Sequence, residues 1–295
     1  MKRFLFACLF PASILQLPAE VREFKNNKGQ IIKAEPVKMR GTNVLLRMEN
    51  KQQVPVPLKN FSGEDQVWLR NWMTWDPMAL DYNLLCKPVE KAGEAARQKF
   101  TYFRYEAVPR GYEVQITNGG QTAIDGVKVS YRIFMEDRVD ETGNTQLKAS
   151  FHSGTAELPL LKYNGTHTLV TKKLKCEKLS PVDGWTFYVG KVTRDRLRGV
   201  WLRFHRHGVM VNEYKSQGVP KCEWPENKAE TRELEEDKAA AAKGAEKAAN
   251  AAMLPATAEP PVKPEVHPPA SAKPKTPKVE DPDELPEELK MFELE

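Results

Sequence analysis

From about residue 99 to residue 225, apolar and polar side chains alternate in short runs that turn residues interrupt. In Val127-Lys-Val-Ser-Tyr131-Arg-Ile133, for example, every second residue is apolar. Successive side chains of a strand point to opposite faces, so this alternation predicts strands with one buried face. The predicted strands are 101–108, 112–117, 126–136, 147–151, 166–174, 185–192, 200–205 and 209–214. Many short strands in one such region predict a β-sandwich of immunoglobulin or fibronectin type III character.

Residues 20–75 form a separate, smaller unit. Short apolar runs at 30–37, 44–48 and 54–58 are separated by polar turns such as Gly41-Thr42-Asn43, which predicts a small antiparallel barrel or meander. Ser62 is expected to start a helix because Glu64 and Asp65 follow in its first turn, where acidic residues favour the helix dipole.

The motifs of this unit resemble a known module. Arg22-x-Phe24, Ala34-Glu-x-Val37 and the run Val56-Pro-Leu-x-x-Phe61-Ser-x-x-Asp65-Gln-x-Trp68-Leu resemble the first homology domain of the Sla-type endocytic adaptors. Similar modules occur in exported bacterial proteins. The resemblance covers residues 22–73, about a sixth of the chain.

The resemblance implies a Src-homology-three-like barrel with a C-terminal helix that binds peptides or proteins and has no catalytic activity. In eukaryotic relatives the module recognises a peptide that contains Asn-Pro-Phe, and the family is associated with adaptor, cytoskeletal-protein and ubiquitin binding. The candidate binding residues are Arg22, Phe24, Lys59, Phe61 and Trp68. The alternative is that the three aromatic residues belong to the core and that the two cations are ordinary solvated charges.

The N-terminus is typical of an export signal. Lys2 and Arg3 precede an apolar run that is too short for a membrane-spanning helix, and Leu17-Pro18-Ala19 is an acceptable cleavage site. A buried N-terminal helix, or a lipoprotein signal around Cys8, is the alternative. We expect residues 1–19 to be a signal peptide and the protein to be exported, either periplasmic or secreted, without a membrane span.

Three cysteines follow the signal, so at most one disulfide bond can form within the chain. Cys176 and Cys222 are the candidate pair because both lie near the ends of predicted strands. The alternative is three free thiols. The cysteine spacing matches no zinc motif, because zinc sites use close pairs.

The sequence contains no motif of a serine hydrolase, zinc protease, phosphate-binding loop or dinucleotide site. His205-x-His207 could place two imidazoles on one face of a strand, but no acidic or thiol ligand stands beside them. We therefore predict no catalytic residues, no metal site and no cofactor.

The stretch 194–207 combines arginines with aromatic residues. If Leu202 and Phe204 point inward, Trp201, Arg203 and His205 line the outer face of their strand, as would His207. With Arg206 nearby, an exposed tryptophan among arginines could bind an acidic polysaccharide, another polyanion or the acidic tail of the chain itself. The binding candidates here are Trp201, Arg203 and Arg206.

Two segments differ from the folded units. Residues 76–98 are predicted to be a connector with a helical piece near 90–98. Residues 226–295 carry 17 acidic and 10 basic side chains, a net charge of −7 that leaves +12 on the preceding residues. Residues 239–252 could form a solvated helix, whereas the proline-rich remainder is predicted to be disordered and could end in a short docking segment.

Taken together, these features predict a mainly β, non-enzymatic exported protein whose small barrel recognises a peptide or protein partner. The alternative is an envelope protein whose β-sandwich binds polysaccharide or another polyanion. We expect no nucleic-acid partner, and self-association stays open.

Overall fold

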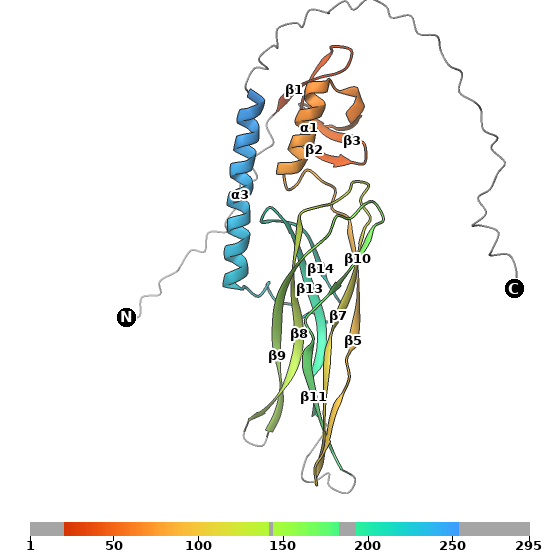
Figure 1. The fold of residues 1–295 in the computed structure, drawn as a ribbon, viewed down its shortest axis with the longest axis vertical. Helices are drawn as coiled ribbons and strands as arrows, with labels where there is room; N and C mark the ends of the chain where they lie inside the picture. Colours follow the sequence, from red (N-terminus) through yellow and green to blue (C-terminus); the bar gives the residue numbers. More distant parts are fainter. Residues whose placement is uncertain (1–20, 142–143, 183–192, 254–295) are drawn as a thin grey trace, which may run out of the picture. The chain divides into compact units, whose positions relative to one another are not determined.

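The computed structural model describes residues 21–141, 144–182 and 193–253. In this part the chain is mainly β, with three antiparallel sheets and two α-helices (Figure 1). None of the helices in the described part is both long and apolar enough to cross a membrane. The predicted signal peptide, the predicted strand 185–192 and the proline-rich end of the chain lie outside the described residues.

The first sheet is a meander of four strands in the order β1-β2-β3-β4. Its strands are β1 (Arg22–Lys25), β2 (Ile31–Arg40), β3 (Asn43–Met48) and β4 (Gln53–Pro57). Among the described strands, β1 and β4 do not pair with each other, so the sheet is open. Of the two predicted forms, barrel or meander, the described strands form the meander. The end of β1 pairs instead with the chain just before the helix, through the bridge between Asn26 and Phe61.

A short 3-10 helix, η1 (Leu58–Asn60), leads into α1 (Gly63–Trp75). Ser62 caps α1 as predicted, because its side chain accepts a hydrogen bond from the backbone N–H of Asp65. Leu69 and Trp72 of α1 are buried and belong to one core with apolar residues of the first sheet. This packing fixes the helix on the sheet.

The region predicted to be a sandwich contains two antiparallel sheets. The second sheet contains β5 (Leu84–Ala92), β6 (Ala96–Lys99), β7 (Phe103–Asn118), β10 (Thr166–Val170), β11 (Leu174–Pro181) and β12 (Thr193–Arg194). The third sheet has the order β14-β13-β8-β9, with β8 (Val127–Glu141), β9 (Asn144–Glu157), β13 (Arg196–Arg206) and β14 (Val209–Lys215).

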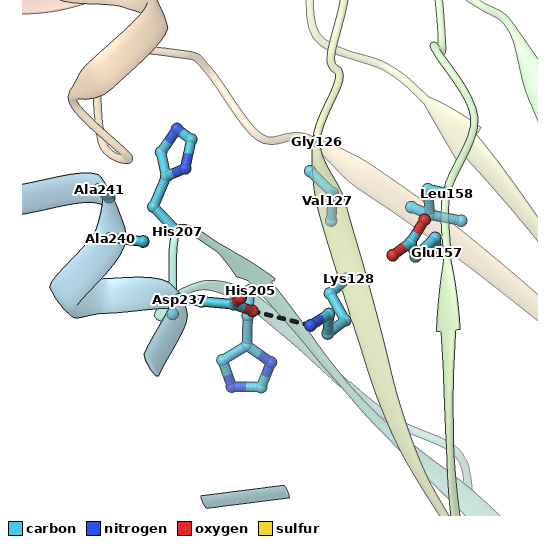
Figure 2. Close-up of a pocket in the computed structure, with 11 residues that line it drawn as sticks. Gly126, Val127, Lys128, Glu157, Leu158, His205, His207, Asp237, Ala240 and Ala241 are labelled. Atoms are coloured by element: carbon cyan, nitrogen blue, oxygen red, sulfur yellow. Dashed lines mark hydrogen bonds and ion pairs between the residues drawn. The ribbon is translucent and has the colours of Figure 1, made fainter. Parts of the chain in front are cut away.

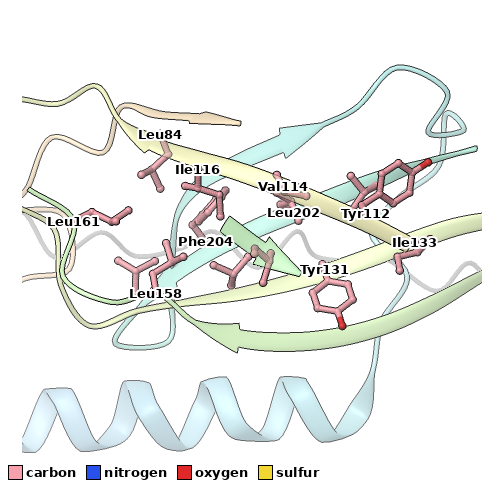
Figure 3. Close-up of a cluster of buried hydrophobic side chains, with 14 of the residues drawn as sticks. Leu84, Tyr112, Val114, Ile116, Tyr131, Ile133, Leu158, Leu161, Leu202 and Phe204 are labelled. Atoms are coloured by element: carbon pink, nitrogen blue, oxygen red, sulfur yellow. The ribbon is translucent and has the colours of Figure 1, made fainter. Parts of the chain in front are cut away.

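One apolar core joins these two sheets. It takes alternate residues such as Val114 and Ile116 from β7 and Tyr131 and Ile133 from β8, so the predicted alternation is confirmed (Figure 3). Leu202 and Phe204 point into the same core, as predicted. The opposite side of β8 and β13 therefore faces away from the core.

Two sequence predictions about strands and connectors were wrong. The pair 101–108 and 112–117 forms one strand, β7. Strand β11 pairs with its residues 103–110 and β5 with its residues 110–118, so strand pairing continues through Arg110 and leaves no turn there. The connector helix expected near 90–98 is replaced by β5 and β6, which also pair with β7. The burial of β5 alternates over its first half, so half-buried strand packing outweighed the helix propensity of its charged residues.

The helix predicted at 239–252 is present and longer than expected. It is α3 (Lys228–Met253), and Asn227 caps its start by accepting a hydrogen bond from the backbone N–H of Ala229. Its first turns contact the third sheet rather than being fully solvated, as the next section describes.

The predicted disulfide bond between Cys176 and Cys222 is not formed. Both cysteines are free: Cys176 is buried and Cys222 is exposed. Cys176 points into the sandwich core, where its Sγ atom lies 3.8 Å from the Sδ atom of Met135. Inward orientation on β11 thus keeps this thiol away from the exposed segment that carries Cys222.

Candidate functional site

The first candidate site lies where β1 meets α1. Asp65 and Trp68 are three residues apart on α1 and therefore lie on the same side of the helix. The guanidinium of Arg22 lies over the Trp68 ring, 4.6 Å from its centre, and one of its nitrogens is 3.4 Å from a carboxylate oxygen of Asp65. We call Arg22, Asp65 and Trp68 the Arg22–Trp68 surface.

Asp65 is the residue of this surface that sequence reasoning missed. It is buried, and its carboxylate accepts hydrogen bonds from the backbone N–H of Lys25 at 2.7 Å and from the Ser62 hydroxyl at 3.0 Å. These bonds tie the end of β1 to the first turn of α1 and place a negative charge beside Arg22. The sequence feature that could have identified Asp65 is the spacing Ser62-x-x-Asp65, which resembles a capping box.

The predicted aromatic residues divide between core and surface. Phe24 and Phe61 are buried, and their rings meet edge to face at 5.6 Å. Trp68 packs against Phe24 at 5.7 Å but is only partly buried. The two phenylalanines therefore belong to the core, whereas part of the Trp68 ring is exposed at the surface. Lys59 is exposed on η1.

The second candidate site is not the open surface that the sequence predicted. Trp201 does point away from the sandwich core, but it is 1% exposed. Trp224 meets its ring edge to face at 5.1 Å, Phe134 stacks at 6.3 Å, and the Lys215 ammonium lies 3.4 Å from the ring centre. The alternation of apolar and polar residues thus predicted correctly that Trp201 points away from the core. It could not predict that the segment after β14 covers this side chain.

Arg203 is only partly exposed and is already paired. It forms a 2.8 Å ion pair with Glu213 of β14, and its guanidinium lies 4.6 Å from the centre of the Trp224 ring. The Glu213 carboxylate therefore partly neutralises the charge of Arg203 within the fold.

Arg206 is 5% exposed, so the prediction that it belongs to an open basic patch was wrong. Its side chain donates hydrogen bonds to the carbonyls of Met73 and Asp76, at the C-terminal end of α1, and it pairs with Asp125 at 3.3 Å. A cation at this position stabilises the negative end of the helix dipole. Arg206 is a helix cap rather than an anion-binding residue.

His205 and His207 do not share a strand face. His205 is 6% exposed on β13, whereas His207 lies in the turn after β13 with a φ of 50°. The Nε2 atom of His207 is 2.9 Å from the carbonyl oxygen of Thr74. Within residues 21–141, 144–182 and 193–253, no group of three histidine, cysteine or acidic residues is arranged to hold a metal ion.

The outward side of β8 and β13 carries polar and aromatic residues that another part of the chain covers. We call it the outer face of the third sheet; it consists of Lys128, Ser130, Arg132, Trp201, Arg203 and His205. Two of its three cations pair with acidic residues of α3. Arg132 pairs with Glu230 at 2.5 Å, and Lys128 pairs with both Glu233 and Asp237 at 2.7 Å.

Trp224 and Pro225 anchor the chain just before α3. The Arg132 guanidinium lies 4.3 Å from the centre of the Trp224 ring and donates a hydrogen bond to the Pro225 carbonyl at 3.0 Å. Arg203 also lies over Trp224, so two cations contact one ring. The cations that pair with the acidic segment of the same chain, Lys128 and Arg132, were not among the predicted residues. The predicted Arg203 pairs with Glu213 instead.

Two cavities remain between α3 and the outer face. The larger, of about 360 Å³, is lined by Lys128, His205 and His207 on one side and by Asp237, Ala240 and Ala241 of α3 on the other (Figure 2). The smaller, of about 290 Å³, includes Leu234 and Glu230. The helix therefore does not pack tightly along the sheet.

The surroundings of the outer face shift the pKa values of His205 and Lys128. Burial lowers the pKa of His205, and although Glu230 opposes the shift, Arg203 and Lys128 add to it. Burial also acts against the charge of Lys128, but hydrogen bonds from its ammonium to Asp237 and Glu233 outweigh that effect and raise its pKa. His205 is therefore neutral and Lys128 is charged at neutral pH.

Comparison with known proteins adds little to this picture. No family model matches the chain, and no curated protein matches it. Among solved structures, the chain is similar to the X-ray structure of Northeast Structural Genomics Consortium target SoR45. That match has 12% sequence identity and a TM-score of 0.20, and it covers 49% of this chain and 93% of the other.

Proposed function

We propose that this chain is a non-enzymatic, exported binding protein and that its first unit recognises a peptide or protein partner. The observation that supports this most is the Arg22–Trp68 surface, where a cation and a partly exposed aromatic ring are stacked together. The finer assignments, a Src-homology-three-like module and an immunoglobulin-type sandwich, are part of the same proposal. So is the signal peptide at residues 1–19.

The chemistry of this surface suits a protein partner. Tryptophan and arginine are the residue types that contribute most often to the binding free energy at protein interfaces. The Trp68 ring offers an apolar contact, and Arg22, whose side chain is 40% exposed, can still donate hydrogen bonds to a carbonyl or carboxylate. Asp65 holds Arg22 in place before binding, which reduces the entropy lost when the complex forms.

The alternative function, binding of a polysaccharide or another polyanion by the sandwich, has weaker support. Trp201 and Arg206 are buried, and Arg203 is paired with Glu213. An external polyanion would have to replace contacts that the chain makes with itself.

The test uses the full chain and a fluorescein-labelled peptide that contains Asn-Pro-Phe, with binding followed by anisotropy. We expect saturable binding that Trp68→Ala weakens about 30-fold, because loss of a central aromatic contact costs about 2 kcal/mol. Trp68→Phe, which keeps a ring against Phe24, should retain part of the affinity.

Arg70→Ala is the matched control, because Arg70 is an exposed residue of the same helix. Its affinity should equal that of the unmodified protein. The proposal that the Arg22–Trp68 surface binds such a peptide would be contradicted if the Trp68→Ala variant bound it as tightly as the unmodified protein. Absence of peptide binding by the unmodified protein would contradict it as well.

A further inference from the structure

The outer face of the third sheet has an unusual composition for a covered surface. Ser130, Arg132 and Trp201 are at most 1% exposed, and Lys128 and Arg203 add two more cations. Such a face cannot be buried by an ordinary apolar helix, because buried charges need partners. It requires an acidic cover.

The first turns of α3 supply that cover with matched spacing. Glu230, Glu233 and Asp237 lie on one side of the helix and span about 10 Å along its axis. Lys128 and Arg132 lie on one face of β8 and are about 13 Å apart along the strand. A row of acidic side chains on a helix thus faces a row of basic side chains on a strand. Figure 2 shows one of these pairs, Lys128 with Asp237.

The contact between α3 and the sheet depends on charge more than on apolar packing. Among the side chains described for α3, residues 228–246, only that of Glu230 is fully buried. Two cavities separate the helix from the outer face. Glu233 and Asp237 are about half exposed, so salt weakens their pairing with Lys128. Elements with few buried apolar contacts open at low free-energy cost.

We propose that the outer face of the third sheet is a docking surface for an acidic amphipathic helix of a partner protein, and that α3 occupies it in the free protein as an internal ligand. The partner would carry acidic residues at the i, i+3 and i+7 positions and an aromatic residue before the helix, as Trp224 stands before α3. This proposal concerns a different surface from the Arg22–Trp68 surface and does not depend on the proposed function.

The test uses the full chain and a labelled synthetic peptide with the sequence of residues 224–246. Glu233→Gln combined with Asp237→Asn removes the two exposed ion pairs of α3 and keeps the buried pair of Glu230 with Arg132. We expect this variant to bind the peptide about tenfold more tightly than the unmodified protein, with an affinity that falls as salt rises.

Three controls make the result specific. Glu236→Gln combined with Glu246→Gln makes the same change in charge at exposed positions of α3 and should leave peptide affinity unchanged. Adding Lys128→Gln to the weakened variant should abolish the gain. A peptide with Glu230, Glu233 and Asp237 neutralised should not bind.

Several outcomes would overturn the proposal. One is unchanged peptide affinity in the weakened variant, whether or not hydrogen exchange shows that α3 opens more often. Another is tighter binding of heparin than of the peptide, because the face would then recognise charge density rather than an acidic helix. A gain of equal size in the Glu236→Gln, Glu246→Gln control would also contradict it.

Discussion

Asp65 and Glu230 are both buried carboxylates, and a guanidinium lies beside each of them. Asp65 fixes Arg22 at a surface that remains partly open, whereas Glu230 neutralises Arg132 in a contact that is closed to water. The same pair of residue types thus positions a binding group in one place and holds a helix in the other. Sequence patterns do not distinguish these roles, because the partner in each pair lies more than 40 residues away.

The three cysteines of the described residues should differ strongly in reactivity. Burial raises the pKa of Cys176 to about 11 and that of Cys86 to about 12, so few of these thiols are ionised near pH 8. Cys222 is exposed and should react first with iodoacetamide in the native protein, as peptide mass spectrometry can show.

After denaturation without a reductant, Cys86, Cys176 and Cys222 should all be labelled. If Cys176 and Cys222 were both protected under those conditions, they would form the disulfide bond that the structure lacks.

His205 should make the folded protein less stable at acidic pH. Burial lowers its folded-state pKa below 6.5, so the unfolded chain binds a proton at a higher pH than the folded chain. The free energy of unfolding should therefore fall as the pH drops below about 6.5 and approaches the folded pKa.

Urea unfolding at several pH values can measure this effect. His205→Phe should flatten the profile in that range, and His167→Gln, at a partly exposed position on β10, should not. An unchanged slope in the His205→Phe variant would show that other groups cause the pH dependence.

At the scale of secondary structure, α3 is held on the third sheet mainly by the buried ion pair of Arg132 and Glu230. Arg132→Gln leaves the Glu230 carboxylate buried without its charge partner and should lower the free energy of unfolding by about 3 kcal/mol. Lys128→Gln removes two more exposed ion pairs and should cost about 1 kcal/mol or less. Chemical denaturation measures both.

The double variant Arg132→Met, Glu230→Met provides the check. It should recover much of the lost stability, since an apolar pair can replace a buried ion pair. If each single variant were as stable as the unmodified protein, the pair would not anchor the helix.

The elements that could be predicted from the sequence are those whose signal is local. Alternation placed β8, β13 and β14, and Ser62 marked the start of α1. The predictions of a turn at 109–111 and of a helix near 90–98 were wrong, because strand pairing along β7 outweighed local turn and helix preferences. What covers a face also depends on contacts distant in sequence, so the burial of Trp201 by Trp224 could not be read from periodicity.

At the scale of the whole molecule, the two candidate surfaces differ in whether another part of the chain covers them. The outer face of the third sheet is covered by α3, whereas the Arg22–Trp68 surface keeps a partly exposed ring and guanidinium. Arg22 and Trp68 of this surface are among the candidate binding residues that the resemblance of residues 22–73 implies. Asp65, which sets the position of Arg22, became visible only when β1 and α1 were brought together.

The most direct measurement of the central claim is site-specific photo-crosslinking of the full chain in cells that produce it. A photoreactive residue at Val67, which is 59% exposed beside Trp68, is compared with one at Val170, which is 60% exposed on β10. We predict a defined protein adduct from position 67 that Trp68→Ala removes, and none of that mass from position 170. An adduct formed equally from both positions, or one that persists in the Trp68→Ala variant, would contradict a binding role for the first unit.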